Sequence, residues 1–323
     1  MPTLPFLTLD VFTDTRYLGN PLGVVRIPHG HPTPPTHEQK QKIAKEFNLS
    51  ETIFLHENPE APADTQEGEE EEEEEVVKID IFTFDQELPF AGHPTVGAGY
   101  YLHTLRGSRA KRLALMTKAG KIPVQALEGN VAALEVPHDV HLHKAEMVST
   151  EMMVLFPSVS HDDYHGELSC MPVFSIVKGM TFVLPRLASV EALGRVTPSA
   201  HLATPHLDAP WDKGLVGVFF YVIMKWETVG DVCIWDLRTR MILGLLEDPA
   251  TGSASCALSA YLALGEGRKR GVLTHKFRLL QGVEMGRRSS VGIEIVLKEG
   301  AKELQSLRMS GTAVRVMQGT IEY

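Results

Sequence analysis

Three side chains that could move a proton or bind an anion stand on two similar turns. The first turn, Glu87–Pro94, carries His93, and the second, Glu247–Ala254, carries Asp248 and Ser253. Imidazole and carboxylate groups can exchange protons with a substrate, and a hydroxyl group can donate a hydrogen bond to an anion. These residue types together indicate a site that holds a small polar molecule and acts on it.

Each turn contains a glycine at which a helix is expected to begin. Gly92 precedes the apolar segment 95–105, and Gly252 precedes the apolar segment 253–264. The first N–H groups of a helix have no partner inside the helix and lie at the positive end of its dipole, so they attract a carboxylate or a phosphate. The alternative is two capped helices without a ligand, in which Ser253 serves only as a cap.

The two turns belong to a longer repeat. When the chain is aligned with itself at the constant shift that carries Gly92 onto Gly252, identical residues recur without a gap, and the residues between them are small or apolar in both copies. The repeat predicts two halves, each wrapping strands around one buried helix, with both helix starts facing a shared cleft. The identical pairs are Glu87 and Glu247, Pro89 and Pro249, Gly92 and Gly252, Tyr101 and Tyr261, and Leu102 and Leu262.

The elements that must position these turns are mostly strands. A helix is expected at 36–47, where Thr36 and Gln39 have the spacing of a capping box. Strands and helices do not alternate regularly, so the fold class is α/β (α+β) and not a doubly wound sheet. Strand patterns occur at 4–11, 22–27, 53–55, 76–82, 112–117, 121–127, 131–136, 172–178, 180–184, 216–224, 231–237, 276–280, 291–297 and 312–317.

Composition and charge exclude several classes of protein. The 323 residues allow two domains, and the net charge is −10, of which Glu67 and the run Glu69–Glu75 carry eight charges. The rest of the chain has no basic stripe that would bind nucleic acid. The acidic run is interpreted as a solvated loop between two strands, with a bait for basic partners as the alternative. No signal peptide, membrane-crossing segment or disulfide framework is recognisable, which predicts a cytoplasmic protein without a membrane partner.

Motifs for a cofactor or a metal are not found in the sequence. There is no phosphate-binding loop of the Walker type, and Gly97 and Gly99 lack the third glycine of a dinucleotide-binding turn. The histidines His138, His141 and His143 have no neighbouring acidic or cysteine residues that complete a zinc site, so they are interpreted as solvated loop residues. We therefore expect neither a cofactor nor a metal.

Six segments occur in a fixed order: Asp10–Thr13, Gly19–Pro21, Asn48–Thr52, Phe90–Thr95, Glu247–Ala254 and Gln281–Arg287. This set resembles one known family, the PhzF-like isomerases of phenazine biosynthesis, which have the diaminopimelate-epimerase-like fold. The resemblance implies two pseudo-symmetric halves, each a β-barrel-like sheet around a central helix, with the active site between them, and commonly a homodimer. Residues 1–118 with 306–323 would form the half that carries Glu51 and His93, and residues 119–305 the half that carries Asp248 and Ser253.

The resemblance also implies an activity and a role for each site residue. The glutamate of the Asn48–Thr52 segment is the acid/base residue of the family, which is Glu51 here, and His93, Asp248 and Ser253 correspond to the pocket residues. The implied reaction is a cofactor-independent isomerisation of a small, cyclic carboxylate such as trans-2,3-dihydro-3-hydroxyanthranilate. One departure is Arg288, which stands where the family often has proline. The substrate-binding residues implied by the family are Asn20, Gly92, Thr95, Thr251 and Gly252.

Two other functions remain open at the level of sequence. A racemase or epimerase of the same superfamily uses two cysteines that face each other, but the nearest thiol, Cys256, lies three residues inside its helix and its repeat counterpart is Val96. We therefore interpret Cys256 as a small core residue. The third possibility is a protein that binds a small anion and has lost turnover.

Overall fold

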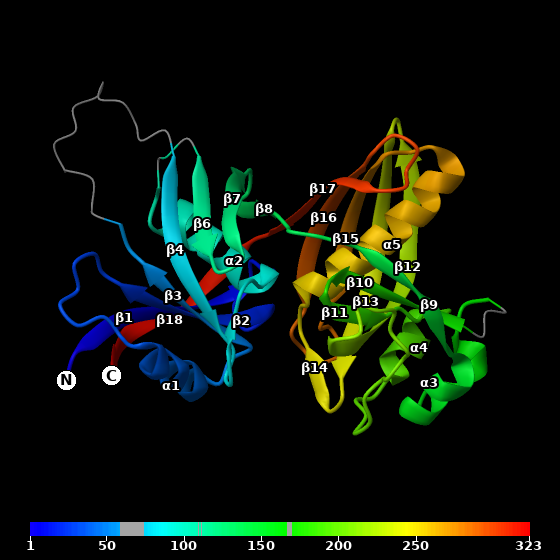
Figure 1. Cartoon of the computed structure of the whole chain (residues 1–323), viewed down its shortest axis with the longest axis horizontal. Helices are drawn as coiled ribbons and strands as arrows, with labels where there is room; N and C mark the ends of the chain where they lie inside the picture. The colour runs from blue at the N-terminus through cyan, green and yellow to red at the C-terminus, as the bar shows by residue number, and fades with distance from the viewer. Residues whose placement is uncertain (59–73, 109, 111, 167–169) are drawn as a thin grey trace. The chain divides into compact units, whose positions relative to one another are not determined.

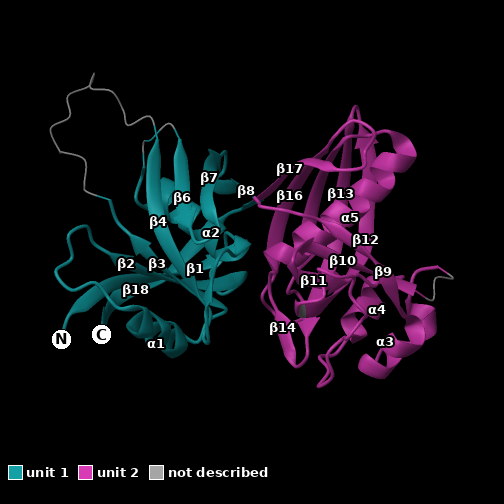
Figure 2. Cartoon of the chain, viewed as in Figure 1, with its two compact units in different colours: residues 1–135, 310–323 teal, residues 136–309 magenta. Residues whose placement is uncertain are grey.

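The computed structural model describes the chain except residues 59–73, 109, 111 and 167–169. It divides into two compact units, Met1–Glu135 with Ser310–Tyr323 as unit 1 and Val136–Met309 as unit 2 (Figure 2). The boundaries of these units lie at 135/136 and 309/310, whereas the halves predicted from the sequence have theirs at 118/119 and 305/306. The strands at 120–127 and 131–135 pair in sequence after the strand at 113–117, which keeps them in unit 1.

Unit 1 is a curved sheet in which β1 pairs with both β18 and β2, and the sheet continues through β3, β4, β6, β7 and β8. Its elements are β1 (Thr3–Val11), β2 (Asn20–Ile27), α1 (His37–Phe47), β3 (Glu51–His56), β4 (Glu75–Phe82), β5 (Glu87–Leu88), α2 (Gly92–Tyr100), the π-helix Tyr101–Leu105, β6 (Leu113–Thr117), β7 (Gly120–Leu127), β8 (Val131–Glu135) and β18 (Ala313–Glu322) (Figure 1).

Unit 2 repeats this plan, with a sheet that runs through β9, β10, β11, β12, β13, β15 and β16. Its elements are β9 (His141–Val148), α3 (Ser149–Leu155), the 3-10 helix His161–Asp163, β10 (Cys170–Val177), β11 (Gly179–Val183), α4 (Val190–Arg195), β12 (Gly214–Val229), β13 (Val232–Leu243), β14 (Leu246–Asp248), α5 (Gly252–Arg270), β15 (Thr274–Gln281), β16 (Ser289–Leu297) and β17 (Leu304–Gly311), of which Ser310 and Gly311 already belong to unit 1.

The two sheets have the same succession of strand directions. From β18 to β7 in unit 1 and from β9 to β16 in unit 2, the pairings are antiparallel, antiparallel, parallel, antiparallel, parallel and antiparallel. The register also repeats, because Phe82 lies opposite Glu87 in unit 1, and Ile242 lies opposite Glu247 in unit 2. The shift that carries the first pair onto the second is the same one that carries Gly92 onto Gly252. The predicted fold class and the pseudo-symmetric halves are therefore confirmed.

A buried helix lies inside each sheet, as the apolar sequences predicted. Every residue of α2 from His93 to Tyr100 is buried, and α2 packs against β1, β2, β3, β7 and β8. Small residues allow this close packing, since a Cβ atom at Gly97 would lie 2.3 Å from Leu22. The helix α5 packs in the same way against β10, β11, β12, β15 and β16. Each of these helices begins at the predicted glycine, Gly92 or Gly252.

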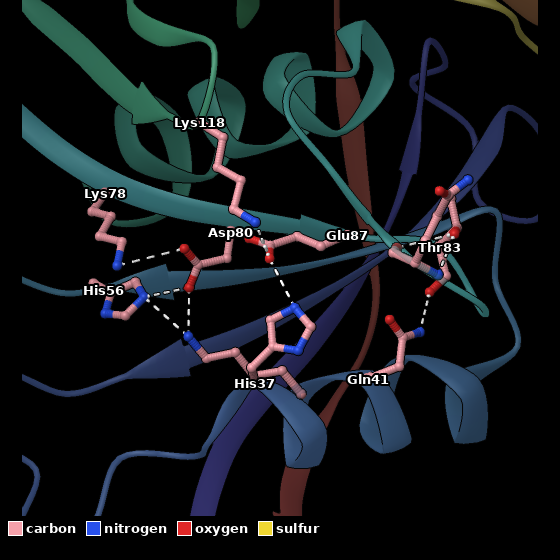
Figure 3. Close-up of polar contacts among 10 residues, drawn as sticks. His37, Gln41, His56, Lys78, Asp80, Thr83, Glu87 and Lys118 are labelled. Carbon is pink, nitrogen blue, oxygen red and sulfur yellow. Dashed lines mark hydrogen bonds and ion pairs between the residues drawn. The ribbon is translucent and has the colours of Figure 1, made fainter. Parts of the chain in front are cut away.

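The predicted helix at 36–47 is α1, and the capping box of Thr36 and Gln39 is formed. Ion pairs attach α1 to the sheet (Figure 3). Asp80 on β4 accepts hydrogen bonds from Lys40 at 2.5 Å and from His56 at 2.7 Å, and both charged partners of the first contact are largely buried. Burial acts to raise the pKa of Asp80, but the hydrogen bonds from His56 and Lys40 outweigh it and hold the pKa well below the usual range of an aspartate.

Most of the acidic run lies outside the described residues. The strands on either side of it, β3 and β4, pair antiparallel as predicted. The last residue of the run, Glu75, is not a solvated loop residue, because it begins β4 and its side chain is 11% exposed. Arg106 donates to both of its carboxylate oxygens at 2.5 and 2.6 Å, and Ser108 donates to one of them at 2.6 Å. The interpretation as a solvated segment therefore needs correction at this end of the run.

Two short helices of unit 2, α3 and α4, were not predicted from the sequence, and neither were β9 and β17. The side chain of Ser189 caps α4 by accepting a hydrogen bond from the N–H of Ala192 at 3.1 Å. That spacing is the local signal that could have indicated the helix. In the described part of the chain, no helix combines the length and the apolar character needed to cross a membrane.

Candidate active site

A histidine and a glutamate from two different elements of unit 1 are in direct contact. Glu51 is the first residue of β3, and His93 is the second residue of α2. Their contact joins Glu51 Oε2 to His93 Nδ1 at 2.8 Å. The imidazole is almost completely buried, with 4% of its side chain exposed, whereas the Glu51 side chain is 18% exposed. The carboxylate therefore remains accessible to a small molecule while the imidazole behind it does not.

The second imidazole nitrogen determines how many protons this pair holds. His93 Nε2 lies 3.2 Å from the carbonyl oxygen of Asn20, which can only accept a hydrogen bond, so Nε2 carries a hydrogen. The remaining proton lies between Nδ1 and Glu51 Oε2. Either it is on Nδ1 and Glu51 is a carboxylate, or it is on Glu51 and the imidazole is neutral. In both cases the pair presents a carboxyl group that can give or take one proton.

Phe12, the residue that follows β1, places its aromatic ring near the imidazole of His93. Phe12 has a positive φ of 64°, which is rare for a bulky residue, and it is 1% exposed. Its ring centroid lies 6.4 Å from that of His93. A Cβ atom at Gly311 would come within 2.4 Å of the Phe12 ring, so the neighbouring strand must have glycine at this point. The strained backbone at Phe12 thus serves to place an aromatic ring beside His93.

In unit 2, the residues at the start of α5 form a second polar group. Asp248 ends β14, and its Oδ2 accepts a hydrogen bond from the hydroxyl of Thr251 at 2.6 Å. Its Oδ1 lies 3.4 Å from the N–H of Ala250. Gln281, which is completely buried, donates to the Asp248 carbonyl oxygen at 2.7 Å and contacts Thr251. Sequence reasoning did not give Gln281 a role, although the residue begins one of the family-like segments.

Both helix starts leave their first N–H groups without a side-chain cap. Ala91 and Thr251 occupy the cap positions of α2 and α5, and neither side chain bonds to its helix. Ser253 is the second residue of α5 and is half-buried, so its interpretation as the cap is wrong. The hydroxyl of Thr95 points back into α2, where it donates to the carbonyl oxygen of Ala91 at 2.7 Å, and Thr95 is fully buried.

The structure thus brings Asn20, Glu51 and His93 together in unit 1, and it brings Asp248 and Thr251 together in unit 2. Gly92 and Gly252 open the helices on which His93 and Ser253 stand. That both groups contact one substrate stays a prediction.

The repeat shows that the two halves are not equivalent at the position of Glu51. Glu51 lies opposite Leu22 across β2 and β3, and Gly217 lies opposite Phe182 across β11 and β12. Leu22 and Phe182 are counterparts in the repeat, because the shift that carries Gly92 onto Gly252 also carries Leu22 onto Phe182. Their partners on the neighbouring strands, Glu51 and Gly217, are therefore counterparts as well. The half with Ser253 therefore has no carboxylate where the half with His93 has its acid/base candidate.

Cys256 lies inside the core, as interpreted from its place in the helix. It is 0% exposed, and burial raises the pKa of its thiol far above the usual range. A buried thiol held in the protonated form is a poor base. This observation disfavours the cysteine-dependent alternative.

The histidines of β9 require a correction. His143 is 4% exposed and His141 stacks on Trp211 with centroids 5.0 Å apart, so neither is a solvated loop residue. His141, His143 and Asp208 lie close enough to suggest a metal site. However, His143 Nδ1 accepts from the N–H of Asp208 at 3.0 Å, which leaves Nε2 to donate to Ser175 at 2.8 Å. His143 therefore has no free lone pair for a metal ion.

Comparisons with known proteins identify the family of the chain. An uncharacterized isomerase of Mesorhizobium japonicum is 32% identical over 330 residues, covering 99% of each chain. The trans-2,3-dihydro-3-hydroxyanthranilate isomerase of Pseudomonas fluorescens is 28% identical and covers 98% of each chain. A crystal structure of a PhzF-family phenazine biosynthesis protein from Bacillus anthracis covers 100% of both chains with a TM-score of 0.75 at 21% identity. The model of the PhzC-PhzF family, described as phenazine biosynthesis-like protein, matches residues 9–319. The chain belongs to the phenazine biosynthesis-like PhzC-PhzF family.

Proposed function

We propose that this protein is a cofactor-independent isomerase that moves a proton between two carbon atoms of a small, cyclic carboxylate. The observation that carries the proposal is the 2.8 Å contact between Glu51 and His93, which joins a carboxylate that is 18% exposed to a buried imidazole. Its relatives along nearly the full chain are named isomerases, and the chain is an isomerase. The identity of the substrate and the mechanism belong to the proposal.

The reaction proceeds in two proton transfers, both through Glu51. In its carboxylate form, Glu51 removes a proton from a carbon atom of the substrate, and the electrons of the broken C–H bond enter the conjugated system. In its acid form, Glu51 returns a proton to another carbon atom of that system. His93 Nδ1 stabilises the carboxylate before each cycle, and the Asn20 carbonyl keeps the imidazole in the required orientation.

The other family-like residues bind the substrate in this proposal. The uncapped N–H groups at Gly92 and Gly252 suit the carboxylate of the substrate, because they carry partial positive charge. Ser253 can donate a hydrogen bond to an anion, and Asp248 can accept one from a hydroxyl or amino group. The resemblance further supports a homodimer, which sedimentation equilibrium would test.

A two-base racemase is the weaker alternative. Such an enzyme needs one base in each half, so that a proton leaves one face of the substrate and another arrives on the opposite face. Gly217 occupies the position in unit 2 that corresponds to Glu51, and Cys256 is buried. A single acid/base residue instead predicts that the proton leaves and returns on the same face.

Incubation in D₂O with trans-2,3-dihydro-3-hydroxyanthranilate tests the proposal. We expect isomerisation, with one deuterium incorporated on a single face of the ring, as seen by NMR spectroscopy. In the same assay, His93→Ala should lower kcat and raise KM, each by about 10-fold or more, since it removes a buried hydrogen-bond partner of the carboxylate. Binding of the compound without any exchange would instead support a non-catalytic anion-binding protein.

A further inference from the structure

The last residue of β15 is joined to the start of α5 by three hydrogen bonds. Gln281 Nε2 donates to the carbonyl oxygen of Asp248 at 2.7 Å and to the hydroxyl oxygen of Thr251 at 3.1 Å. Gln281 Oε1 accepts from the N–H of Thr251 at 3.2 Å. Gln281 is 0% exposed. Every polar atom of its amide therefore faces a single short segment of unit 2.

The chemistry of these partners fixes the orientation of the amide. The N–H of Thr251 can only donate, so it must face Gln281 Oε1, and the carbonyl oxygen of Asp248 can only accept, so it must face Nε2. If the amide were flipped, Nε2 would face the N–H of Thr251 and Oε1 would face the carbonyl oxygen of Asp248, so neither pair could form a hydrogen bond. Nε2 is consequently a donor toward the hydroxyl oxygen of Thr251.

The orientation of the amide in turn fixes the hydroxyl hydrogen of Thr251. Its oxygen accepts from Gln281, which leaves its single hydrogen for Oδ2 of Asp248 at 2.6 Å. The hydrogen bonds thus run in one direction, from amide to hydroxyl to carboxylate. This direction favours an ionised Asp248 that is held in one orientation, because the hydroxyl hydrogen of Thr251 points at its carboxylate oxygen.

The turn that follows Gln281 touches the same segment. Gly282 has a positive φ of 72°, and a Cβ atom there would lie 2.6 Å from the carbonyl oxygen of Pro249. Only glycine fits both the backbone angle and the short distance. The close approach leaves the segment before α5 little room to shift relative to Gln281.

The other half of the molecule lacks this relay. Met116 lies opposite Lys78, and Leu280 lies opposite Arg238. Arg238 is the repeat counterpart of Lys78, so the residue after Met116, Thr117, is the counterpart of Gln281. The hydroxyl of Thr117 donates to the carbonyl oxygen of Gly120 at 3.0 Å, within its own turn. In unit 1, Thr117 therefore stabilises its own turn. In unit 2, Gln281 is linked through Thr251 to the carboxylate of Asp248, which is a candidate substrate-binding residue.

We infer that Gln281 is a positioning residue for the reaction, which orients the Asp248 carboxylate toward the substrate through Thr251. The inference rests on the proposed function, in which Asp248 binds a hydrogen-bond donor of the substrate. Gln281 itself acts only through Thr251 and the segment before α5. Its loss should therefore change substrate binding more than the proton transfers at Glu51.

The test compares Gln281→Met, which keeps the size of the side chain and removes its hydrogen bonds, with Thr117→Ala as the matched control. With trans-2,3-dihydro-3-hydroxyanthranilate as the probe, we expect KM to rise about 10-fold or more in Gln281→Met while kcat falls less than about threefold. The acid limb of kcat/KM against pH should move to higher pH, since Gln281 no longer holds the Thr251 hydroxyl as a donor to the Asp248 carboxylate. Thr117→Ala should leave both quantities unchanged. Equal KM values and equal pH profiles in an active wild type and Gln281→Met would overturn the inference.

A measurement without substrate separates this inference from the proposed function. The Asp248 carboxyl carbon can be followed by ¹³C NMR spectroscopy during an acid titration of the wild type, Gln281→Met and Thr251→Val. The midpoint should move upward in both variants, because each interrupts the relay to Oδ2. If the wild type shows no isomerisation but the midpoints move, the proposed function fails and the relay stands. If Gln281→Met does not fold, an unchanged midpoint in Thr251→Val still contradicts the relay.

Discussion

The two halves of the molecule share a backbone plan and differ in chemistry at matched positions. Where unit 1 has Glu51 and His93, unit 2 has Gly217 and Ser253. Where unit 2 has Gln281 beside the start of its central helix, unit 1 has Thr117. The common strand order preserves two helix starts, while single substitutions leave a carboxylate in unit 1 and a glycine at the matched position in unit 2. A repeat can thus build the frame of a site without making the site symmetric.

The two halves also differ in how they attach α1 and α4, the helices that connect parallel strands in unit 1 and unit 2. In unit 1, Asp80 holds Lys40 of α1, and the matched residue in unit 2, Arg240, forms a two-bond ion pair with Glu247 at 2.8 Å for each bond. Arg240 further donates to the carbonyl oxygens of Leu193 and Val196 at the end of α4, at 2.9 and 2.6 Å. Asp80 is negative and Arg240 is positive, yet each of these residues binds the helix that connects the parallel strands of its own half.

Replacement of Glu51 should produce the largest change, because unit 2 has no second carboxylate at the matched position. Glu51→Gln keeps the size of the side chain but cannot exchange a proton, so turnover should fall by about 10²- to 10⁴-fold while ligand affinity stays within about tenfold. Steady-state kinetics and ligand titration provide the two measurements. Near-normal turnover in this variant would refute the single-base mechanism.

The ion pairs that attach α1 and α4 should contribute unequally to the free energy of unfolding. Arg240→Met leaves Glu247 without its partner and uncaps two carbonyl groups, and we expect the free energy of unfolding to fall by about 3–5 kcal/mol. Lys40→Met should cost about 1–2 kcal/mol, since Asp80 keeps His56 and the more distant Lys78. Urea unfolding of the two variants measures both losses. Equal losses would show that the anchors are energetically equivalent.

The dependence of protein stability on pH should show how much the ionised Asp80 carboxylate contributes. Its pKa is lower in the folded chain than in the unfolded chain, so its contribution is complete above the unfolded pKa of about 3.9 and is lost as the pH falls below that value. Asp80→Asn should therefore be less stable than the wild type by about 1–3 kcal/mol between pH 5 and pH 7. The gap should shrink between pH 4 and pH 2 in thermal or urea unfolding. A gap that stays constant in acid would contradict the assigned role of the carboxylate.

The acidic run should give the smallest effect. Deletion of residues 60–73 keeps Glu74 and Glu75 and should change the free energy of unfolding by less than about 0.5 kcal/mol, because so densely charged a segment has little apolar surface to bury. Glu75→Gln is the comparison within the same run and should cost about 1–2 kcal/mol, since it weakens the contacts with Arg106 and Ser108. Differential scanning calorimetry distinguishes the two. A deletion that destabilises the protein more than Glu75→Gln would contradict this expectation.

Local sequence signals predicted the parts of the fold that depend on neighbouring residues. The capping box at Thr36, the two glycine helix starts and the repeat of the Glu87–Pro94 turn at Glu247–Ala254 are all visible in short segments. The role expected for Glu51 came from the resemblance to a family, because no spacing in the sequence links it to His93, 42 residues away.

Contacts between distant residues account for what the sequence did not indicate. Phe12 reaches His93 only because its backbone adopts a positive φ, and Gln281 reaches Asp248 only because β15 ends beside the start of α5. The buried state of His143 depends likewise on Asp208 and Ser175, which come from other elements. Such contacts follow from the pairing of strands and leave no periodic signal.

The strand β18 gives the molecule an order of assembly during synthesis. β1 pairs along its length with β18, whose residues leave the ribosome only after all of Val136–Met309 has been made. Unit 2 is continuous in sequence and can close its own sheet while β1 still has an unpaired edge. An exposed edge of this kind is prone to pair with other chains. In the nascent chain, this edge of β1 therefore stays without its partner until β18 has been made, later than it would in a protein with two consecutive domains.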